Sequence, residues 1–291
     1  MEKYKIKEQR NKIILKNMKD FNPKHIFECG QAFRWIKEED NSYTAISKGR
    51  VVNVKREDGD VVFNDTNLED FKNIWYHYFD LETDYGQIKR ELAKDPILEE
   101  AIEFGDGLRI LNQEPFETTI SFIISANNQI PRIKRSIELI SKHFGKQIKE
   151  DYYSFPTADK LAQVQVDELK EISRVGFRAQ RIVDTSRLVA EGAIDINSIY
   201  KLSKEEGKEL LMTLPGVGPK VSECILLFAY KKREAFPVDV WVKRVMEHFY
   251  LKEDRKVQDI EKEGARLFGD LAGFAQQYLF YYARELGIGR N

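Results

Sequence analysis

The sequence contains little cysteine: Cys29 and Cys224 are the only two among 291 residues. Two thiols cannot form a disulfide framework, a four-thiolate zinc site or an iron–sulfur cluster held by cysteines alone. Long apolar runs are also missing, and a chain without 18 consecutive apolar residues has no membrane-spanning helix. The first seven residues lack the apolar core of a secretory signal. We therefore expect a cytoplasmic protein without a membrane anchor, a targeting signal or an iron–sulfur cluster.

An excess of charge of either sign is missing as well. The 47 Lys and Arg residues nearly balance the 48 Asp and Glu residues, which argues against an obvious nucleic-acid binder. The charges are nevertheless segregated, because residues 56–84 carry nine acids and two bases. Residues 128–146, 173–187 and 212–245 have net charges of +4, +3 and +3. One such segment is typical of a solvated helix face, but three in one half of the chain indicate a polarised molecule.

The pattern of apolar residues changes once along the chain. Before residue 65, short aromatic and β-branched stretches alternate with turn signals, which predicts strands at 33–39, 43–48, 50–56 and 61–63. From residue 68 onward the period is helical. The expected helices cover 68–79, 88–92, 97–104, 116–127, 131–144, 158–163, 166–172, 178–191, 198–214, 219–231, 240–249, 257–268 and 272–286.

These patterns predict an α+β fold in which a small sheet packs against a larger helical bundle. We expect an N-terminal antiparallel β-sheet domain with flanking helices over residues 1–112. A mostly α-helical domain would follow over residues 113–291. No repeat or linker separates the two, so we expect them to pack tightly.

The most specific local motif is Leu214-Pro-Gly-Val-Gly-Pro-Lys220. Glycines two positions apart permit a tight reversal between two helices, and they leave backbone N–H groups open at a helix N-terminus, where phosphate binds well. The motif is typical of a helix-hairpin-helix, here about residues 205–232, that binds the DNA backbone. The alternative is a plain corner between two helices.

Two side chains near the hairpin suggest chemistry. Lys220 lies in the first turn of the second helix, where a cation is disfavoured and a desolvated neutral amine would be a nucleophile. Asp239 follows 19 residues later, just before a helix. Each has an ordinary interpretation, since surface lysines are common and an aspartate before a helix is usually a cap. The combination of hairpin, lysine and aspartate favours catalysis.

The hairpin, Lys220 and the downstream Pro237-Val-Asp239 together resemble the helix-hairpin-helix DNA glycosylase superfamily. Its endonuclease III-like and adenine-mismatch members usually carry a four-cysteine iron–sulfur cluster, and its alkylbase glycosylases lack the lysine. A lysine without a cluster resembles the 8-oxoguanine DNA glycosylase branch, and specifically a bacterial member similar to the eukaryotic enzymes. Four further elements are similar to that branch, at residues 29–35, 121–132, 176–179 and 274–280.

The resemblance implies a base-excision repair enzyme that is both a DNA N-glycosylase, a hydrolase of N-glycosyl bonds, and an AP lyase. It would flip 8-oxoguanine out of duplex DNA, opposite cytosine, and act as a monomer without a catalytic cofactor. Lys220 would attack C1′ and form a Schiff base, followed by β-elimination. Asp239 would orient the lysine and stabilise positive charge on the sugar. In a prokaryote the enzyme would lie at the nucleoid.

The resemblance also implies a pocket for the damaged base. The carbonyl of Gly30 would accept the N7–H that guanine gains on oxidation, and Gln276 would read the Watson–Crick edge. Cys224 and Phe280 would sandwich the ring. Each of these residues has an ordinary alternative, since a buried cysteine or phenylalanine usually belongs to the core.

On the opposite strand, Asn127, Arg132 and Arg178 would bind the estranged cytosine, while Phe177 would wedge into the vacated stack. At the hairpin, Gly216, Gly218 and Lys220 would contact phosphate. A structural monovalent cation or Ca²⁺ would bind three backbone carbonyls there. These carbonyls belong to Met212, Leu214 and Val217.

Three positions depart from the pattern of the eukaryotic members. Trp241 stands where a histidine is usual, Ala283 replaces the aspartate that partners it, and Phe177 replaces a tyrosine. The first two changes remove a phosphate contact, and the third predicts looser selectivity for cytosine. Two other functions remain open at this point: a glycosylase for another damaged purine, such as an alkylated base, and a non-catalytic DNA-binding protein.

Overall fold

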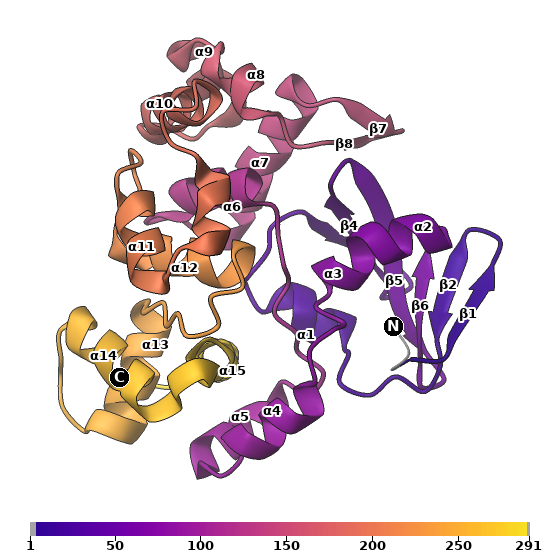
Figure 1. Cartoon of the computed structure of the whole chain (residues 1–291), viewed down its shortest axis with the longest axis vertical. Coiled ribbons are helices and arrows are strands. Elements are labelled where there is room, and N and C mark those ends of the chain that lie inside the picture. Colours follow the sequence, from indigo (N-terminus) through magenta and orange to yellow (C-terminus); the bar gives the residue numbers. More distant parts are fainter. Residues whose placement is uncertain (1–3, 290–291) are drawn as a thin grey trace.

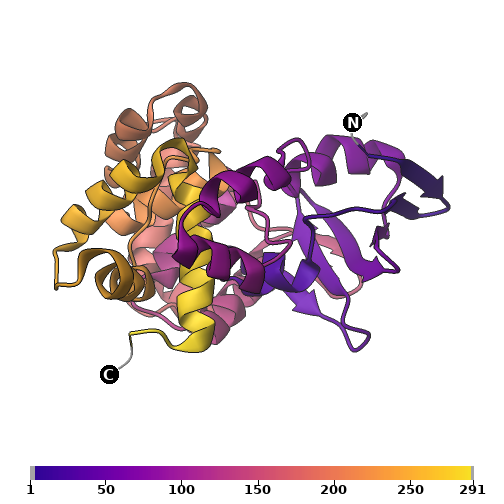
Figure 2. The same ribbon diagram turned by 90° about the horizontal axis from the view of Figure 1, so that it is seen from below.

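The computed structural model describes residues 4–289. A β-sheet part and a larger helical part lie side by side, as the two views in Figures 1 and 2 show. The sheet has six antiparallel strands in the order β1-β2-β6-β5-β4-β3. Their bounds are β1 Ile6–Gln9, β2 Lys12–Leu15, β3 Trp35–Lys37, β4 Tyr43–Ser47, β5 Arg50–Glu57 and β6 Asp60–Asn64.

The four predicted strands are confirmed as β3 to β6. Two tight reversals set their register: Lys48-Gly49 joins β4 to β5, Asp58-Gly59 joins β5 to β6, and all four residues have positive φ. Strands β1 and β2 were missed, because the sequence Ile-Lys-Glu-Gln of β1 is largely exposed and gives no apolar alternation.

One face of the sheet is covered by a helix that runs from α2 (Leu68–Asp70) through a π-helical turn to α3 (Tyr76–Tyr78). Aromatic rings fill the space between them, and Phe63 packs edge-on against both Phe71 and Phe79 at 5.1 and 5.4 Å. This cluster gives the small sheet a core of its own.

The remaining helices follow the predicted order, except that α1 was not predicted. They are α1 Pro23–Glu28, α4 Tyr85–Leu92, α5 Pro96–Phe104, α6 Pro115–Ser125, α7 Ile130–Phe144, α8 Ala158–Ala162, α9 Val166–Ser173, α10 Arg178–Ala190, α11 Lys204–Met212, α12 Pro219–Ala229, α13 Val240–Val245, α14 Val257–Phe268 and α15 Ala272–Leu286. A small hairpin of β7 Gln147–Lys149 and β8 Tyr152–Tyr153 was not predicted. The α+β fold is confirmed.

One predicted helix, 198–214, is wrong as a single element. It divides into a 3₁₀ turn, Ile196–Lys201, and α11. The division occurs because Ser203 and Glu206 form a reciprocal capping box that begins a new helix.

The C-terminal helix α15 brings distant parts of the chain together. It packs against α5, α13 and α14, and its buried Gln277 donates a 3.0 Å hydrogen bond to the carbonyl of Cys29. The core of the helical part is continuous and includes Cys29 and Phe33 from the N-terminal part. The loop after α1 is therefore held against α15.

Candidate active site

The hairpin between α11 and α12 contains two glycines, and each is under a different structural constraint. Gly216 has φ +90°, and a Cβ there would lie 2.9 Å from the Arg181 side chain. Gly218 caps α12, and a Cβ there would meet no atom within 4 Å. The first glycine is thus required by the turn, whereas the second leaves the amide end of α12 open to an approaching anion.

Lys220 begins α12 beside this turn and is partly exposed. Its Nζ lies 5.5 Å from the ring centre of Phe122 and bonds to Cys224 one turn later. Burial alone would lower the pKa of Lys220, but Cys224 and Asp239 outweigh it, and the net pKa is raised. The resting side chain is therefore an ammonium that must lose a proton before it can attack carbon.

Asp239 is both a helix cap and part of the candidate site. Its Oδ1 accepts from the amides of Trp241 at 2.9 Å and Val242 at 2.8 Å, which begins α13. Oδ2 takes no part in this cap. Burial raises the pKa of Asp239, while the two amides and Lys220 oppose the shift.

Lys220 and Asp239 line one small cavity together with the four residues of the predicted base pocket. The cavity has a volume of about 40 Å³, which is room for roughly one water molecule. Its lining consists of Gly30, Phe122, Lys220, Cys224, Phe228, Pro237, Asp239, Gln276, Gln277 and Phe280. Segments separated by up to 250 residues in the chain thus converge on one point, and the cavity must widen to hold a purine.

Two glutamines of this cavity, Gln276 and Gln277, differ in their hydrogen bonding. Gln276 is 4% exposed, and its Oε1 has no hydrogen-bond partner. The neighbouring Gln277 is equally buried but uses its amide to hold the Cys29 carbonyl beside Gly30. A buried acceptor without a partner is costly and is typical of a site that receives a ligand.

The cavity walls are partly aromatic. Phe122 and Phe228 stack with ring centres 5.6 Å apart, and Phe280 lies on the side of Gly30. Burial raises the pKa of the Cys224 thiol, so this wall is uncharged at neutral pH. Sequence reasoning missed Phe122, which lies in the element 121–132, and Gln277, which adjoins Gln276.

The residues predicted to bind the estranged base lie outside this cavity, where α6 connects to α7 and α9 connects to α10. Arg178 is buried, and its guanidinium donates to the carbonyls of Ala126, Asn127 and Val175. Asn127 has φ +50°, so Arg178 fixes a strained loop. In this structure most Arg178 donors are used within the protein.

Phe177 is the most exposed aromatic residue of this loop region, with 63% of its surface accessible. The guanidinium carbons of Arg178 and Arg181 lie 4.5 and 5.2 Å from its ring centre. Arg132 is exposed near the start of α7. An exposed ring supported by two cations suits insertion into a base stack.

Trp241 and Ala283 fit the packing of α13 against α15. Ala283 is fully buried, and the Arg244 guanidinium lies 5.1 Å from the Trp241 ring centre. Trp241 thus contacts a cation on its own helix at the position where a histidine is expected, and the position expected for its aspartate is the buried methyl group of Ala283.

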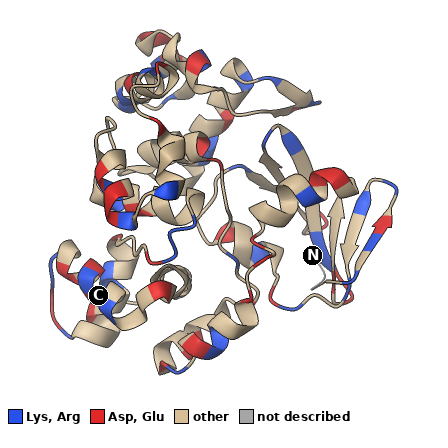
Figure 3. Ribbon diagram, viewed as in Figure 1, with Lys and Arg blue, Asp and Glu red and all other residues tan. Residues whose placement is uncertain are grey.

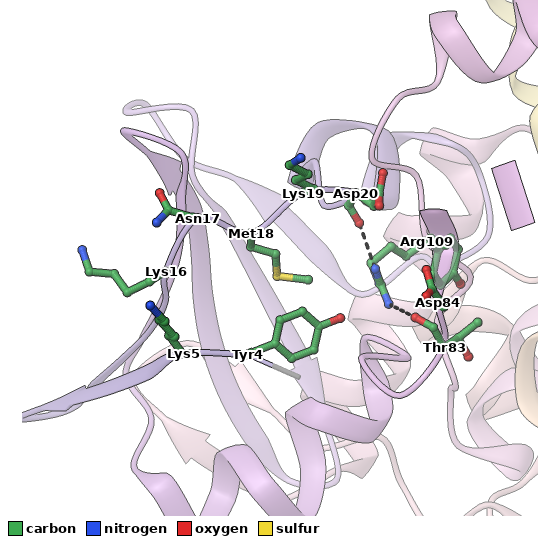
Figure 4. Close-up of a pocket in the computed structure, with 11 residues that line it drawn as sticks. Tyr4, Lys5, Lys16, Asn17, Met18, Lys19, Asp20, Thr83, Asp84 and Arg109 are labelled. Carbon is green, nitrogen blue, oxygen red and sulfur yellow. Dashed lines mark hydrogen bonds between the residues drawn. The ribbon is translucent and has the colours of Figure 1, made fainter. Parts of the chain in front are cut away.

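A larger cavity of about 350 Å³ lies far from these residues, between the N-terminal segment and the turn before α4 (Figure 4). Its floor is Arg109, which is 1% exposed and donates to the carbonyls of Phe79, Asp20 and Asp80. The guanidinium also lies 4.0 Å from the Tyr85 ring centre. Because Arg109 ties together backbone segments, we assign this cavity a structural role.

Positive and negative charges are less segregated in the structure than the sequence predicts. Figure 3 shows both signs on both halves of the molecule. Two acids of the 56–84 segment are neutralised, since Asp60 pairs with Lys16 at 2.5 Å and Asp70 pairs with Arg50 at 3.2 Å. Within residues 4–289, no cluster of three His, Cys, Asp or Glu side chains is arranged to bind a metal ion, and no helix could cross a membrane.

Comparison with known proteins agrees with this geometry. Residues 13–119 match the family described as the N-terminal domain of 8-oxoguanine DNA glycosylase, and residues 120–269 match the HhH-GPD superfamily of base excision DNA repair proteins. The "Probable N-glycosylase/DNA lyase" of Methanothermobacter thermautotrophicus is 36% identical in an alignment of 245 residues that covers 77% of each chain.

Two solved structures are similar over nearly their whole length. One is Clostridium acetobutylicum 8-oxoguanine glycosylase/lyase in complex with DNA containing cytosine opposite 8-oxoguanine, at 46% identity and a TM-score of 0.95. The other is MBOgg1 with a low-affinity DNA ligand, at 47% identity and the same TM-score. Each covers 98% of this chain and 99% of its own. The chain therefore belongs to the HhH-GPD superfamily of base-excision DNA repair proteins and, within it, to the 8-oxoguanine DNA glycosylases.

Proposed function

We propose that the protein excises 8-oxoguanine from duplex DNA and then cleaves the strand as an AP lyase. One observation carries the proposal: Gly30, Lys220, Asp239 and Gln276 come from distant segments and line the same cavity. The names of the most similar relatives, N-glycosylase/DNA lyase and 8-oxoguanine glycosylase/lyase, support it. The reaction needs no catalytic cofactor, because side chains supply its nucleophile and its charge.

Lys220 and Asp239 divide the chemistry of the first step. As the glycosidic bond breaks, its electron pair leaves with the base, and the carboxylate of Asp239 stabilises the positive charge on the sugar. The departing base takes a proton from the Lys220 ammonium, and the neutral amine then attacks C1′. The amine nitrogen loses a proton and O4′ gains one as the ring opens to a Schiff base, and β-elimination then removes a proton from C2′ and breaks the C3′–O bond, which expels the 3′ phosphate.

The base pocket would read features that distinguish the lesion from guanine. The Gly30 carbonyl accepts from N7–H, which guanine lacks, and the unpartnered Oε1 of Gln276 accepts from the Watson–Crick edge. Cys224 and Phe280 hold the two faces of the ring. A buried acceptor left unpaired by the wrong base discriminates strongly.

Phe177 would fill the gap left by the flipped base, and Asn127, Arg132 and Arg178 would surround the base opposite. A phenylalanine provides stacking but no hydroxyl, so we expect similar excision rates opposite cytosine and adenine. A strong cytosine preference would contradict this expectation.

The hairpin would bind phosphate through the backbone at Gly216 and Gly218, beside Lys220. The Leu214 carbonyl accepts from the Val217 amide at 3.1 Å and keeps a second lone pair. That lone pair, with the carbonyls of Met212 and Val217, suits a hard structural cation bridging to phosphate. Contact with genomic DNA would place the enzyme at the nucleoid of a prokaryotic cell.

Trapping with borohydride tests the proposal. Duplexes that carry 8-oxoguanine, an alkylated purine or guanine are incubated with the protein and reduced. We expect a covalent adduct only with 8-oxoguanine and none with Lys220→Gln. An adduct with the alkylated purine alone, or release of that base without an adduct, would assign the enzyme to another lesion, and binding with neither adduct nor base release would indicate a non-catalytic DNA-binding protein.

A further inference from the structure

Arg284 lies beside the base pocket and has no role in the chemistry above. It follows Gln276 by eight residues and Phe280 by four on α15, so the three side chains share one face of the helix. Gln276 and Phe280 both line the cavity. Arg284 lies on the same face one turn further along, behind Gly30, and is not among the residues that line the cavity.

The contacts of Arg284 place its guanidinium against the Gly30 loop. Nη2 donates to the Glu28 carbonyl at 2.5 Å and to the Glu285 carboxylate at 2.7 Å. Nη1 lies 2.8 Å from the point that a Cβ on Gly30 would occupy, and the Phe280 ring lies 3.1 Å from that point. Gly30 is thus a glycine because Arg284 and Phe280 fill the space of a side chain.

One nitrogen of the guanidinium lacks a hydrogen-bond partner, although the group lies 5.2 Å from the ring centre of Phe280. Nη1 is buried and makes no hydrogen bond, although Nε and Nη2 are both engaged. The Arg284 side chain is 16% exposed, so water does not readily reach this donor. A cationic donor without a hydrogen-bond partner is costly, and here it lies beside Gly30, the residue whose carbonyl is proposed to read the lesion.

We propose that Arg284 is a second lesion-reading residue, whose Nη1 donates to O8 of the flipped 8-oxoguanine. This inference rests on the proposed function. In 8-oxoguanine, N7–H is a donor and the adjacent O8 is an acceptor, whereas guanine presents an acceptor at N7 and a C–H at position 8. The Gly30 carbonyl and Arg284 Nη1 form the complementary acceptor and donor.

The small volume of the cavity is consistent with this assignment. A purine does not fit into 40 Å³, so Phe280 must move from Gly30 when the base enters. That movement uncovers Nη1 at the edge of the new space. A base bearing O8 can then supply the missing acceptor.

The test compares excision with strand cleavage at a preformed abasic site, which contains no base. We expect Arg284→Met to slow single-turnover excision of 8-oxoguanine roughly 10- to 100-fold, the effect of losing a hydrogen bond from a charged donor. Cleavage at the abasic site should stay within about twofold of wild type. Glu285→Gln, which keeps Arg284 but removes its acidic neighbour, serves as the matched control and should excise normally.

A parallel loss of abasic-site cleavage in Arg284→Met would overturn the inference, because Arg284 would then act through Lys220, Asp239 or the fold. Unchanged excision would overturn it too. A second measurement uses a lesion in which sulfur replaces O8 and does not depend on the variant folding. Wild type should excise this lesion at least about tenfold more slowly, and equal rates would contradict the inference. If wild type excised no 8-oxoguanine at all, the proposed function itself would fail.

Discussion

The base pocket and the loop region around Phe177 differ in how their buried polar groups are hydrogen-bonded. In the pocket and directly beside it, Gln276 Oε1 and Arg284 Nη1 are buried without hydrogen-bond partners. In the loop, the Arg178 guanidinium is occupied by carbonyls of its own chain. The pocket is thus unsatisfied and too small for its ligand, whereas the loop is already fixed in a strained shape.

This difference separates residues that serve binding from residues that serve the fold. A buried polar group whose hydrogen-bond partner comes only with the ligand lowers the stability of the free protein. Replacing that group with an apolar one should stabilise the fold and reduce activity. Replacing a polar group that is hydrogen-bonded within the protein should instead lower the stability of the fold. Substitutions in the two regions test this contrast.

The largest effect is expected for Asp239→Asn. Asparagine keeps the helix cap but removes the negative charge, so excision should fall by about 10²- to 10³-fold. A circular-dichroism melt should show that the fold is retained. Because burial raises the pKa of Asp239, the wild-type excision rate should fall with decreasing pH at a value above the ordinary aspartate range. Normal excision by the variant would remove Asp239 from the mechanism.

Gln276→Leu should slow excision by roughly 10- to 100-fold and yet leave the free energy of unfolding equal or higher. The expected gain comes from removing a buried acceptor that costs about 1–3 kcal/mol. Gln277→Leu is the matched control, since it breaks the hydrogen bond to the Cys29 carbonyl and should lower the unfolding free energy. Denaturant titration of both variants measures the contrast, and a destabilised Gln276→Leu would contradict it.

Substitution of the buried arginine in the loop region around Phe177 should lower the unfolding free energy. Arg178→Ala leaves the carbonyls of Ala126 and Asn127 without their donor and should cost about 2–3 kcal/mol of stability, while the Val175 carbonyl keeps the backbone amide of residue 178. Arg181→Ala removes an exposed neighbour that also contacts the Phe177 ring and should cost less than about 0.5 kcal/mol. Equal unfolding free energies for the two variants would show that Arg178 does not hold the loop.

The sequence predicts features formed by neighbouring residues better than contacts between segments that are distant in the chain. The hairpin, the strands β3 to β6 and most helices follow from local patterns, since their signals lie within a few residues. The partners of Gln276 and Gln277 depend on how α15 meets the loop after α1, which no local pattern encodes. Arg284 was missed for the same reason, although its spacing from Phe280 places it on the same face.

The central claim is that Lys220 is the nucleophile of this pocket. The most direct measurement is to reduce the complex with 8-oxoguanine DNA, digest it and locate the modified residue by mass spectrometry. The account predicts a single adduct on the Nζ of Lys220. An adduct on another lysine, or on the N-terminal amine, would contradict it.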